Sequence, residues 1–356
     1  MISVRLRKTF SARPDSPSFS LELEFRAAAG VTVLFGPSGS GKTLTLDLIA
    51  GFVRPDDGRI LLDDEILFDG AAGVSLPPQA RNCGYVFQNY ALFPHMTLRQ
   101  NLEFAAERRP RLERHRRVNE MLERFRLGDA AGRRPHEVSG GQRQRCSIAR
   151  AMIGGPKLLL FDEPAQGLDA PLRAEFYEVL RQVRADFKTP MLLVTHNLGE
   201  CFELGEEMLV LREGRLVQSG APPAILDQPA NVDVARLLGV FNLIPAEIRA
   251  LDPGRNTSKV QMGEYELDGP YFPGHFKGDR VTVCVRPERL AVLARNGRPG
   301  ANQIPAQLDR AIEKPQWMRL EFAGGIAVDL ARPDYERLRD TKQWMIEFPR
   351  ESLRVL

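Results

Sequence analysis

The stretch Val31-Thr-Val-Leu-Phe-Gly-Pro-Ser-Gly-Ser-Gly-Lys-Thr43 decides the fold. It begins with a short β-branched apolar run and ends in the pattern Gly-x-x-x-x-Gly-Lys-Thr over residues 36–43. Glycines let the backbone wrap closely around a phosphate, so that successive N–H groups point inward, and the following helix dipole adds positive potential. The pattern predicts a phosphate-binding loop between a strand over 31–35 and a helix over 43–50.

The residues of this loop have distinct expected roles. Lys42 is expected to reach the β- and γ-phosphates of a nucleotide, and the hydroxyl of Thr43 to ligate Mg²⁺. The expected nucleotide-binding residues here are Gly36, Pro37, Ser38, Gly39, Ser40, Gly41, Lys42, Thr43 and Thr45.

Outside the loop, strand-like and helix-like segments alternate up to about residue 235. Apolar runs at 158–161 and 191–195 are typical of strands that are covered on both faces of a parallel sheet. Residues 98–154 are mostly helical in pattern, and 208–211 with 215–218 indicate a hairpin. Further strand candidates are 59–62 and 83–87. We predict an α/β domain over 1–235, with a mostly parallel sheet and a helical subdomain at about 89–155.

The sequence pattern changes from helical periodicity to short alternating segments after Phe241. Short alternating strands, separated by Gly and Pro, are expected at 280–285, 303–308, 318–322 and 344–348. This spacing predicts a small all-β barrel over 242–356.

The charge balance and the lengths of the apolar runs exclude some classes of function. The 356 residues include 49 Lys and Arg against 46 Asp and Glu, so the electrostatic footprint of a nucleic-acid-binding protein is missing. The longest apolar runs fall far short of the roughly 20 residues that a membrane span requires, and the N-terminus does not resemble a signal peptide. We expect a cytoplasmic, soluble chain whose four cysteines stay reduced.

A second chemical motif is Leu158-Leu-Leu-Phe-Asp-Glu-Pro164. An apolar strand that ends in two acidic residues places carboxylates at the carboxyl edge of the sheet, where α/β sites lie. Asp162 is expected to hold the Mg²⁺ shell and Glu163 to polarise the attacking water. The alternative is an exposed turn, but the phosphate loop upstream favours the functional interpretation.

A third motif, Val138-Ser-Gly-Gly-Gln142, starts a predicted helix. Ser139 is a good N-cap residue, and a Ser-Gly-Gly helix start also makes an anion site. With this motif the chain resembles the ATP-binding subunits of ABC transporters. The resemblance implies ATP as the nucleotide and a head-to-tail homodimer. In that dimer the signature residues of one subunit close over ATP held by the other; here they are Ser139, Gly140, Gly141 and Gln142.

The same resemblance implies further roles. Gln88 matches the glutamine loop, which reaches Mg²⁺ and water and senses the membrane partner. His196 matches the switch histidine at the γ-phosphate, and Asp169 matches the loop that crosses the dimer interface, although Gln166 and Gly167 depart from the usual Ser-Ala-Leu-Asp. Phe10 is the expected adenine-stacking aromatic, with Phe19 as the alternative.

The tail narrows the subtype. Arg286-Pro-Glu288 resembles the OB-like barrel domain of importers for oxyanions, iron, polyamines and sugars. Within that group the chain looks most similar to molybdate importer ATPases, on the short start 1–4 and the segments 30–36, 76–81 and 84–88. Residues 299–302 match an oxyanion-binding strand start but lack its Ser and Arg. We expect the tail to pack against a second tail in the dimer. The arginine-rich run 108–117 is expected to be a solvated helical face, with contact to anionic headgroups as the alternative.

The resemblance implies separate transmembrane permease subunits, an extracytoplasmic substrate-binding protein that acts indirectly, and no nucleic acid. In the family, the region of 93–97 receives the membrane subunits. The expected location is peripheral, on the cytoplasmic face of the inner membrane. Alternative cargoes are sulfate, iron, phosphonate and polyamine. The rival class is a non-transport ABC ATPase of DNA repair or translation, which usually shows coiled-coil insertions, zinc-binding cysteines or two cassettes, and these are not seen in this sequence.

Overall fold

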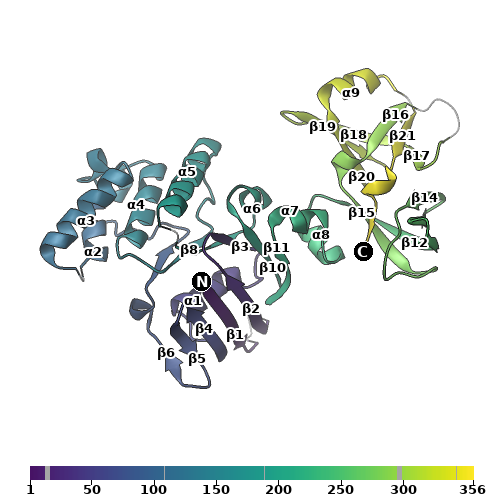
Figure 1. Cartoon of the computed structure of the whole chain (residues 1–356). Coiled ribbons are helices and arrows are strands. Elements are labelled where there is room, and N and C mark those ends of the chain that lie inside the picture. Colours follow the sequence, from purple (N-terminus) through teal and green to yellow (C-terminus); the bar gives the residue numbers. More distant parts are fainter. Residues whose placement is uncertain (13–16, 108, 188, 295–298, 342) are drawn as a thin grey trace. The chain divides into compact units, whose positions relative to one another are not determined.

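The computed structural model describes residues 1–12, 17–107, 109–187, 189–294, 299–341 and 343–356. The chain forms two compact units, Met1–Gln228 and Pro229–Leu356 (Figure 1). Within the described residues, no helix combines the length and the apolar character that a bilayer crossing requires.

The first unit is built on one mixed sheet in the order β6-β5-β4-β1-β2-β11-β10-β3-β9-β8-β7. The run from β10 to β7 is parallel, and β1, β2, β4, β5 and β6 pair in antiparallel fashion. Strands β3, β8 and β9 are buried at every position, as expected for parallel strands covered on both faces. The strands are β1 Ile2–Phe10, β2 Phe19–Ala27, β3 Val31–Phe35, β4 Asp57–Leu62, β5 Glu65–Asp69, β6 Val74–Ser75, β7 Cys83–Val86, β8 Leu158–Asp162, β9 Met191–Thr195, β10 Glu207–Arg212 and β11 Arg215–Gly220.

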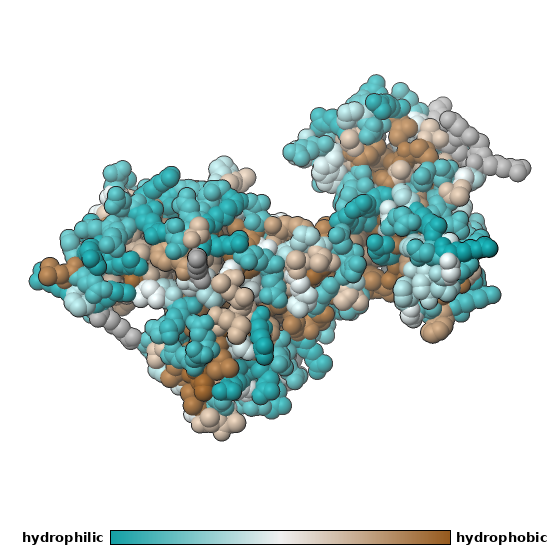
Figure 2. All heavy atoms as spheres, viewed as in Figure 1, coloured by the Kyte–Doolittle hydropathy of each residue, from teal (hydrophilic) through white to brown (hydrophobic). Residues whose placement is uncertain are grey.

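Helices α2 to α4 lie between β7 and β8 in the chain and form the helical insertion, which gathers beside the sheet (Figure 1). Helix α3 takes up most of the arginine-rich run; Arg108 lies outside the described residues. Figure 2 shows a largely hydrophilic surface over α3 to α5. The helices are α1 Lys42–Ala50, α2 Leu98–Ala105, α3 Arg111–Arg124, α4 Gly140–Met152, α5 Ala170–Phe187, α6 Leu198–Leu204 and α7 Pro222–Asp227, with 3-10 turns η1 Pro78–Ala80, η2 Gly128–Ala130 and η3 Pro135–Glu137.

The second unit begins with helix α8 and is otherwise nearly all β. In its described part, three antiparallel sheets, β14-β13-β12-β15-β22, β16-β21-β17 and β18-β19-β20, enclose an apolar core. The elements are α8 Val232–Leu238, β12 Asn242–Asp252, β13 Thr257–Met262, β14 Tyr265–Gly269, β15 Arg280–Val285, η4 Pro287–Arg289, β16 Ala291–Ala294, β17 Gln303–Ala306, β18 Leu308–Glu313, β19 Trp317–Phe322, β20 Ile326–Ala331, α9 Arg332–Leu338, β21 Trp344–Glu347, η5 Arg350–Ser352 and β22 Arg354–Val355. The predicted fold class, an α/β phosphate-loop cassette followed by a small all-β barrel-like domain, is confirmed.

One predicted strand differs. The stretch 303–308 forms two strands, because β17 pairs with β21 whereas β18 pairs with β19 of another sheet. The chain changes sheets at Gln307, whose carbonyl accepts a hydrogen bond from the N–H of Ala323.

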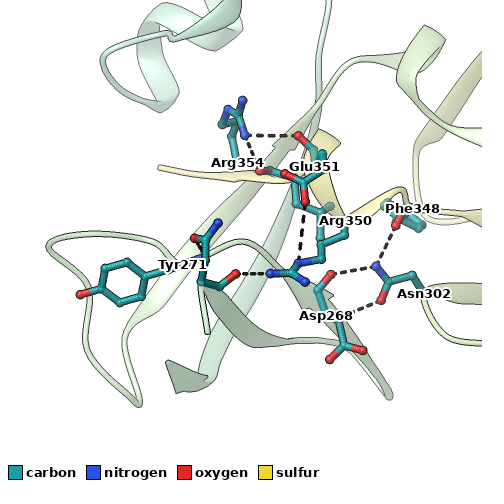
Figure 3. A network of polar contacts seen from close by, with 9 residues as sticks. Asp268, Tyr271, Asn302, Phe348, Arg350, Glu351 and Arg354 are labelled. Atoms are coloured by element: carbon teal, nitrogen blue, oxygen red, sulfur yellow. Dashed lines mark hydrogen bonds and ion pairs between the residues drawn. The ribbon is translucent and has the colours of Figure 1, made fainter. Parts of the chain in front are cut away.

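Asn302 joins separate parts of this second unit (Figure 3). Its side-chain oxygen accepts from the N–H of Asp268 at 2.7 Å, and its amide nitrogen donates to the carbonyls of Asp268 and Phe348 at 2.8 and 2.9 Å. Its backbone, at φ 57°, accepts from the N–H of Phe348. The polar groups of this side chain are therefore engaged in holding β14 beside the end of β21.

Candidate functional site

The phosphate loop leaves a helix start open for an anion. Helix α1 begins at Lys42, and its N-cap, Gly41, offers no side-chain partner to the first N–H groups of the helix. Helices α2 and α4, in contrast, are closed by capping boxes on Thr97 and Ser139. Because the first N–H groups of a helix need external partners, α1 presents a ready anion site.

Two glycines of the loop are required by close packing. A Cβ atom on Gly36 would lie 2.2 Å from the carbonyl oxygen of Leu211, and one on Gly41 would lie 2.5 Å from Cδ1 of Leu21. Gly41 also has φ 99°, a backbone conformation that favours glycine. Glycine at position 36 therefore lets the loop approach the backbone of β10, and at position 41 glycine fits both the left-handed backbone and the nearby Leu21 side chain.

Lys42 lies inside the loop. Its side chain is buried, and Nζ donates to the carbonyls of Gly36 and Pro37 at 2.9 Å each. Burial lowers the pKa of Lys42, while the carboxylates of Glu163 and Asp162 act in the opposite direction. Ser40 Oγ is also buried and has no hydrogen-bond partner within the described part of the chain. An uncapped helix start, an ammonium group and an unpartnered hydroxyl suit a phosphate group.

Thr43 and Asp162 meet beside the loop. The hydroxyl of Thr43 donates to Oδ1 of Asp162 at 2.8 Å, at the carboxyl end of β8. Burial raises the pKa of Asp162, and the hydrogen bond from Thr43 opposes this shift. A hydroxyl and a carboxylate are ligands that Mg²⁺ prefers, usually together with phosphate oxygens. The hydroxyl of Thr43 and the carboxylate of Asp162 therefore fit an Mg²⁺ ion that is also bound by a nucleotide. Among the described residues, no cluster of three or more His, Cys, Asp or Glu side chains is suited to a metal.

Glu163 follows Asp162 in an unusual backbone conformation. Its φ of 44° is rare for a residue with a side chain, and its N–H donates to the carbonyl of Val194 on β9. Its Oε2 lies 3.2 Å from Nδ1 of His196. The structure thus brings together these two predicted site residues at the ends of neighbouring strands, a location where strained backbone often accompanies function.

The glutamine loop and the following loops also meet. The side-chain amide of Gln88, after β7, donates to the side-chain oxygen of Gln166. Asp169 accepts from the N–H of Leu172 at 3.0 Å, in the first turn of α5. Gln166, which departs from the family pattern, is therefore the residue through which this loop contacts Gln88.

The signature residues form the start of α4. Ser139 Oγ accepts from the N–H of Gln142 at 3.2 Å, and Gln142 Oε1 accepts from the N–H of Ser139 at 3.0 Å. The N-cap role expected of Ser139 is therefore present. Gly141 packs closely on α5, where a Cβ atom would lie 3.0 Å from Oε2 of Glu175 and 3.1 Å from Cδ2 of Leu172.

Three other predicted residues are placed differently from one another. Phe10 ends β1 with 39 % of its surface exposed, and Nζ of Lys8 lies 5.5 Å from its ring centroid. Phe19 pairs with Phe10 across the β1–β2 ladder and is half-buried beside Gly41. Thr45 is fully buried, and its hydroxyl donates to the carbonyl of Gly41 at 2.8 Å. The buried Thr45 hydroxyl therefore stabilises the loop backbone at Gly41, whereas the ring of Phe10 remains exposed.

Glu200 is a further residue of the site that was not predicted from the sequence. It lies on α6, four residues after His196, and is only 5 % exposed. Burial raises its pKa, and hydrogen bonds from Thr195 and Tyr177 oppose the shift. Glu200 shares a small pocket with Glu163 and His196. A carboxylate on the buried face of a short helix was the only signal available in the sequence.

Comparisons with known proteins agree with this geometry. A family model described as "ABC transporter" matches residues 20–166. The spermidine/putrescine import ATP-binding protein PotA of Nitratidesulfovibrio vulgaris is 37% identical over 305 residues, which are 83% of this chain and 79% of that protein. The chain belongs to the ABC transporter family.

Other relatives carry different cargo names. The molybdenum import ATP-binding protein ModC of Rhodospirillum rubrum is 39% identical over 250 residues, 70% of this chain and 66% of that protein. The Fe(3+) ions import ATP-binding protein FbpC of Pseudomonas fluorescens is 38% identical over 305 residues, 84% and 80% of the two chains. A solved dimeric structure of the ATP-binding cassette MJ0796 bound to ADP and Pi has a TM-score of 0.53 at 26% identity, and covers 62% of this chain and 99% of that one.

The chain is therefore the ATP-binding subunit of an ABC importer, an ATPase coupled to transport. The predicted family and enzyme class are confirmed. The cargo is not fixed by these relatives, because their names divide among polyamine, molybdenum and iron.

Proposed function

We propose that this ABC importer subunit works as a head-to-tail homodimer on the cytoplasmic face of the inner membrane, where it hydrolyses Mg·ATP to drive molybdate uptake through separate permease subunits. An extracytoplasmic binding protein delivers the cargo. The observation that carries the ATPase part is the Glu163–His196 contact, at 3.2 Å, beside a phosphate loop whose helix start is uncapped.

Phosphoryl transfer depends on positioning and charge stabilisation. Lys42 and the loop N–H groups would bind the phosphates, and Ser139 and Gly140 of a second subunit would close the site. Glu163 would orient the attacking water, and His196 would hold the Glu163 carboxylate in place. Thr43, Asp162 and Gln88 would hold Mg²⁺, which supplies charge neutralisation when bound.

Glu163→Gln tests this assignment. We expect ATP affinity to stay within about threefold while turnover falls at least roughly 100-fold, since removal of a general base typically costs 10²–10⁴-fold. The variant should also accumulate as an ATP-bound dimer on size exclusion. Glu24→Gln, on the exposed face of β2, is the matched control. Normal turnover by a folded Glu163→Gln protein would contradict the role of Glu163.

Molybdate as cargo is supported by the sequence resemblance and by the ModC relative. Polyamine is the second candidate, because the PotA alignment extends further along this chain, over 83% against 70%. Uptake of labelled molybdate, spermidine and Fe³⁺ should be compared in cells with and without the intact gene. Loss of molybdate uptake alone is expected; loss of spermidine uptake alone would replace molybdate by polyamine.

The tail does not offer a free oxyanion ligand at Asn302, because that side chain already binds backbone groups of Asp268 and Phe348. We propose that the tail acts in dimer contact instead. Removal of residues 242–356 should weaken dimer formation, as measured by analytical ultracentrifugation with ATP. Unchanged association would contradict this role.

A further inference from the structure

One side of α4 carries three polar side chains that reach backbone carbonyls of the loops around the site. Gln144, Ser147 and Arg150 are spaced three residues apart and so lie along one side of the helix. The side chains of Gln144 and Ser147 are almost fully buried, at 2 % and 1 % exposure. Buried polar side chains of this kind are retained where they satisfy specific partners.

Two of these side chains bind the segment that follows Gln88. Ser147 Oγ donates to the carbonyl of Tyr90 at 3.0 Å. Arg150 donates to the carbonyl of Ala91 at 2.6 Å through Nη1 and to that of Tyr90 at 3.3 Å through Nη2. Burial lowers the pKa of Arg150, and its guanidinium lies 5.7 Å from the ring centroid of Phe93.

The segment needs such support. Tyr90 and Ala91 have φ of 59° and 47°, so two consecutive residues with side chains adopt the left-handed conformation. Each such residue costs roughly 1–2 kcal/mol without local support, and the conformation persists only when the surroundings fix it. Phe93 is held from the other side, because its N–H donates to Asn101 of α2 at 2.8 Å.

The third side chain, that of Gln144, binds the backbone just after β8, next to Glu163. Gln144 Nε2 donates at 2.9 Å to the carbonyl of Pro164, the residue after Glu163. One helix thus contacts the backbone two or three residues beyond Gln88 and one residue beyond Glu163. The same helix is capped at its start by Ser139.

We propose that Gln144, Ser147 and Arg150 are positioning residues, which fix Gln88 and Glu163 relative to the signature helix so that a displacement of α4 moves both loops together. This inference rests on the proposed ATPase function. The proposed link runs from the signature motif along helix α4, through these three side chains, to the two loops that would hold Mg²⁺ and water.

The first test measures the loop itself in the nucleotide-free full chain. Hydrogen–deuterium exchange of residues 88–93 should be about tenfold faster in Arg150→Met, because two hydrogen bonds from a charged donor are lost. Arg150→Lys should give a smaller increase. Arg109→Met is the matched control, since Arg109 also donates to a carbonyl, that of Gly154 at 3.2 Å, but touches neither loop. Unchanged exchange in Arg150→Met would overturn the inference.

The second test separates positioning from general destabilisation. In Arg150→Met, kcat should fall roughly 10- to 100-fold and half-saturating Mg²⁺ should rise about tenfold, with ATP affinity within threefold, as for displaced supports of metal and water ligands. If Arg150 acts through Gln88, then Arg150→Met should reduce kcat no further in a Gln88→Ala background. A full additional loss in the double variant would overturn the inference.

Ser147→Ala decides the same question if Arg150→Met does not fold, since it removes a single hydroxyl; it should raise exchange of 88–93 severalfold. Wild-type hydrolysis, and its loss in Glu163→Gln, are measured in parallel. Absence of wild-type hydrolysis would refute the proposed function, whereas normal wild-type hydrolysis with unaffected Arg150 and Ser147 variants would refute this inference alone.

Discussion

Arg81 is the most deeply buried charged side chain among the described residues, at 1 % exposure. Its guanidinium donates at 2.8 Å to three carbonyls: those of Leu48 and Ile49 at the end of α1, and that of Leu76. It therefore caps the helix that begins at the phosphate loop. We predict that Arg81→Met strongly destabilises the first unit.

The size of the effect follows from these contacts. Hydrogen bonds to a charged group contribute about 1.5–3 kcal/mol each, so three bonds set a gross loss of roughly 4–9 kcal/mol. Desolvation of the guanidinium, which also lowers the pKa of Arg81, offsets part of this. We expect a net loss of about 3–5 kcal/mol in Arg81→Met, and about 2 kcal/mol in Arg81→Lys, which keeps the charge but not the fork.

The chain supplies its own internal control for this measurement. Both tryptophans, Trp317 and Trp344, lie in the second unit, so their fluorescence reports that unit during urea unfolding. Far-UV circular dichroism reports both units. The dichroism transition of the first unit should move to lower urea while the fluorescence transition stays in place. Arg26→Met, on the exposed face of β2, should stay within about 0.5 kcal/mol of wild type. A first unit unmoved by Arg81→Met would refute the reasoning.

Two further predictions concern the site. Burial raises the pKa of Glu200, so the folded protein holds the carboxyl proton more tightly than the unfolded chain does. The protonated carboxyl therefore adds to the free energy of unfolding. This contribution is fully present below the ordinary glutamate pKa and is lost as the pH rises through the raised pKa. As the pH rises above the ordinary glutamate pKa, Glu200→Gln should therefore lose less stability than wild type, as followed by urea midpoints. An identical pH slope in the two proteins would count against the burial argument. Phe10→Ala should weaken ATP binding about fivefold or more, measured by titration calorimetry, because base–aromatic stacking contributes roughly 1–3 kcal/mol; a larger loss in Phe19→Ala would transfer the stacking role to Phe19.

The centre of the sheet could be predicted from the sequence, because its strands are continuous apolar runs. The consecutive apolar residues of β8 and β9 predicted buried strands, and the glycine pattern predicted the phosphate loop between β3 and α1. These signals are local: each is contained within a few consecutive residues. The hairpin of β10 and β11 was found for the same reason.

The supporting contacts could not be predicted because they join distant parts of the chain. Ser147 and Tyr90 are 57 residues apart, and Arg81 and Leu48 are 33 residues apart. The burial of the Arg81 side chain could not be predicted either, since arginine is seldom fully buried. The left-handed conformation of Tyr90 and Ala91 carries no sequence signal either, because neither residue favours it.

Lys42 has a consequence for the exchange of nucleotides. In this structure its ammonium group is already bonded to the carbonyls of Gly36 and Pro37. A phosphate that binds Lys42 must compete with these two carbonyl acceptors. When ADP leaves, the ammonium group can form its hydrogen bonds with the two carbonyls again. Because these two hydrogen bonds must be exchanged for bonds to phosphate, they reduce the net free energy that Lys42 contributes to nucleotide binding. Weaker binding of this kind would favour the release of ADP at the end of each hydrolysis cycle.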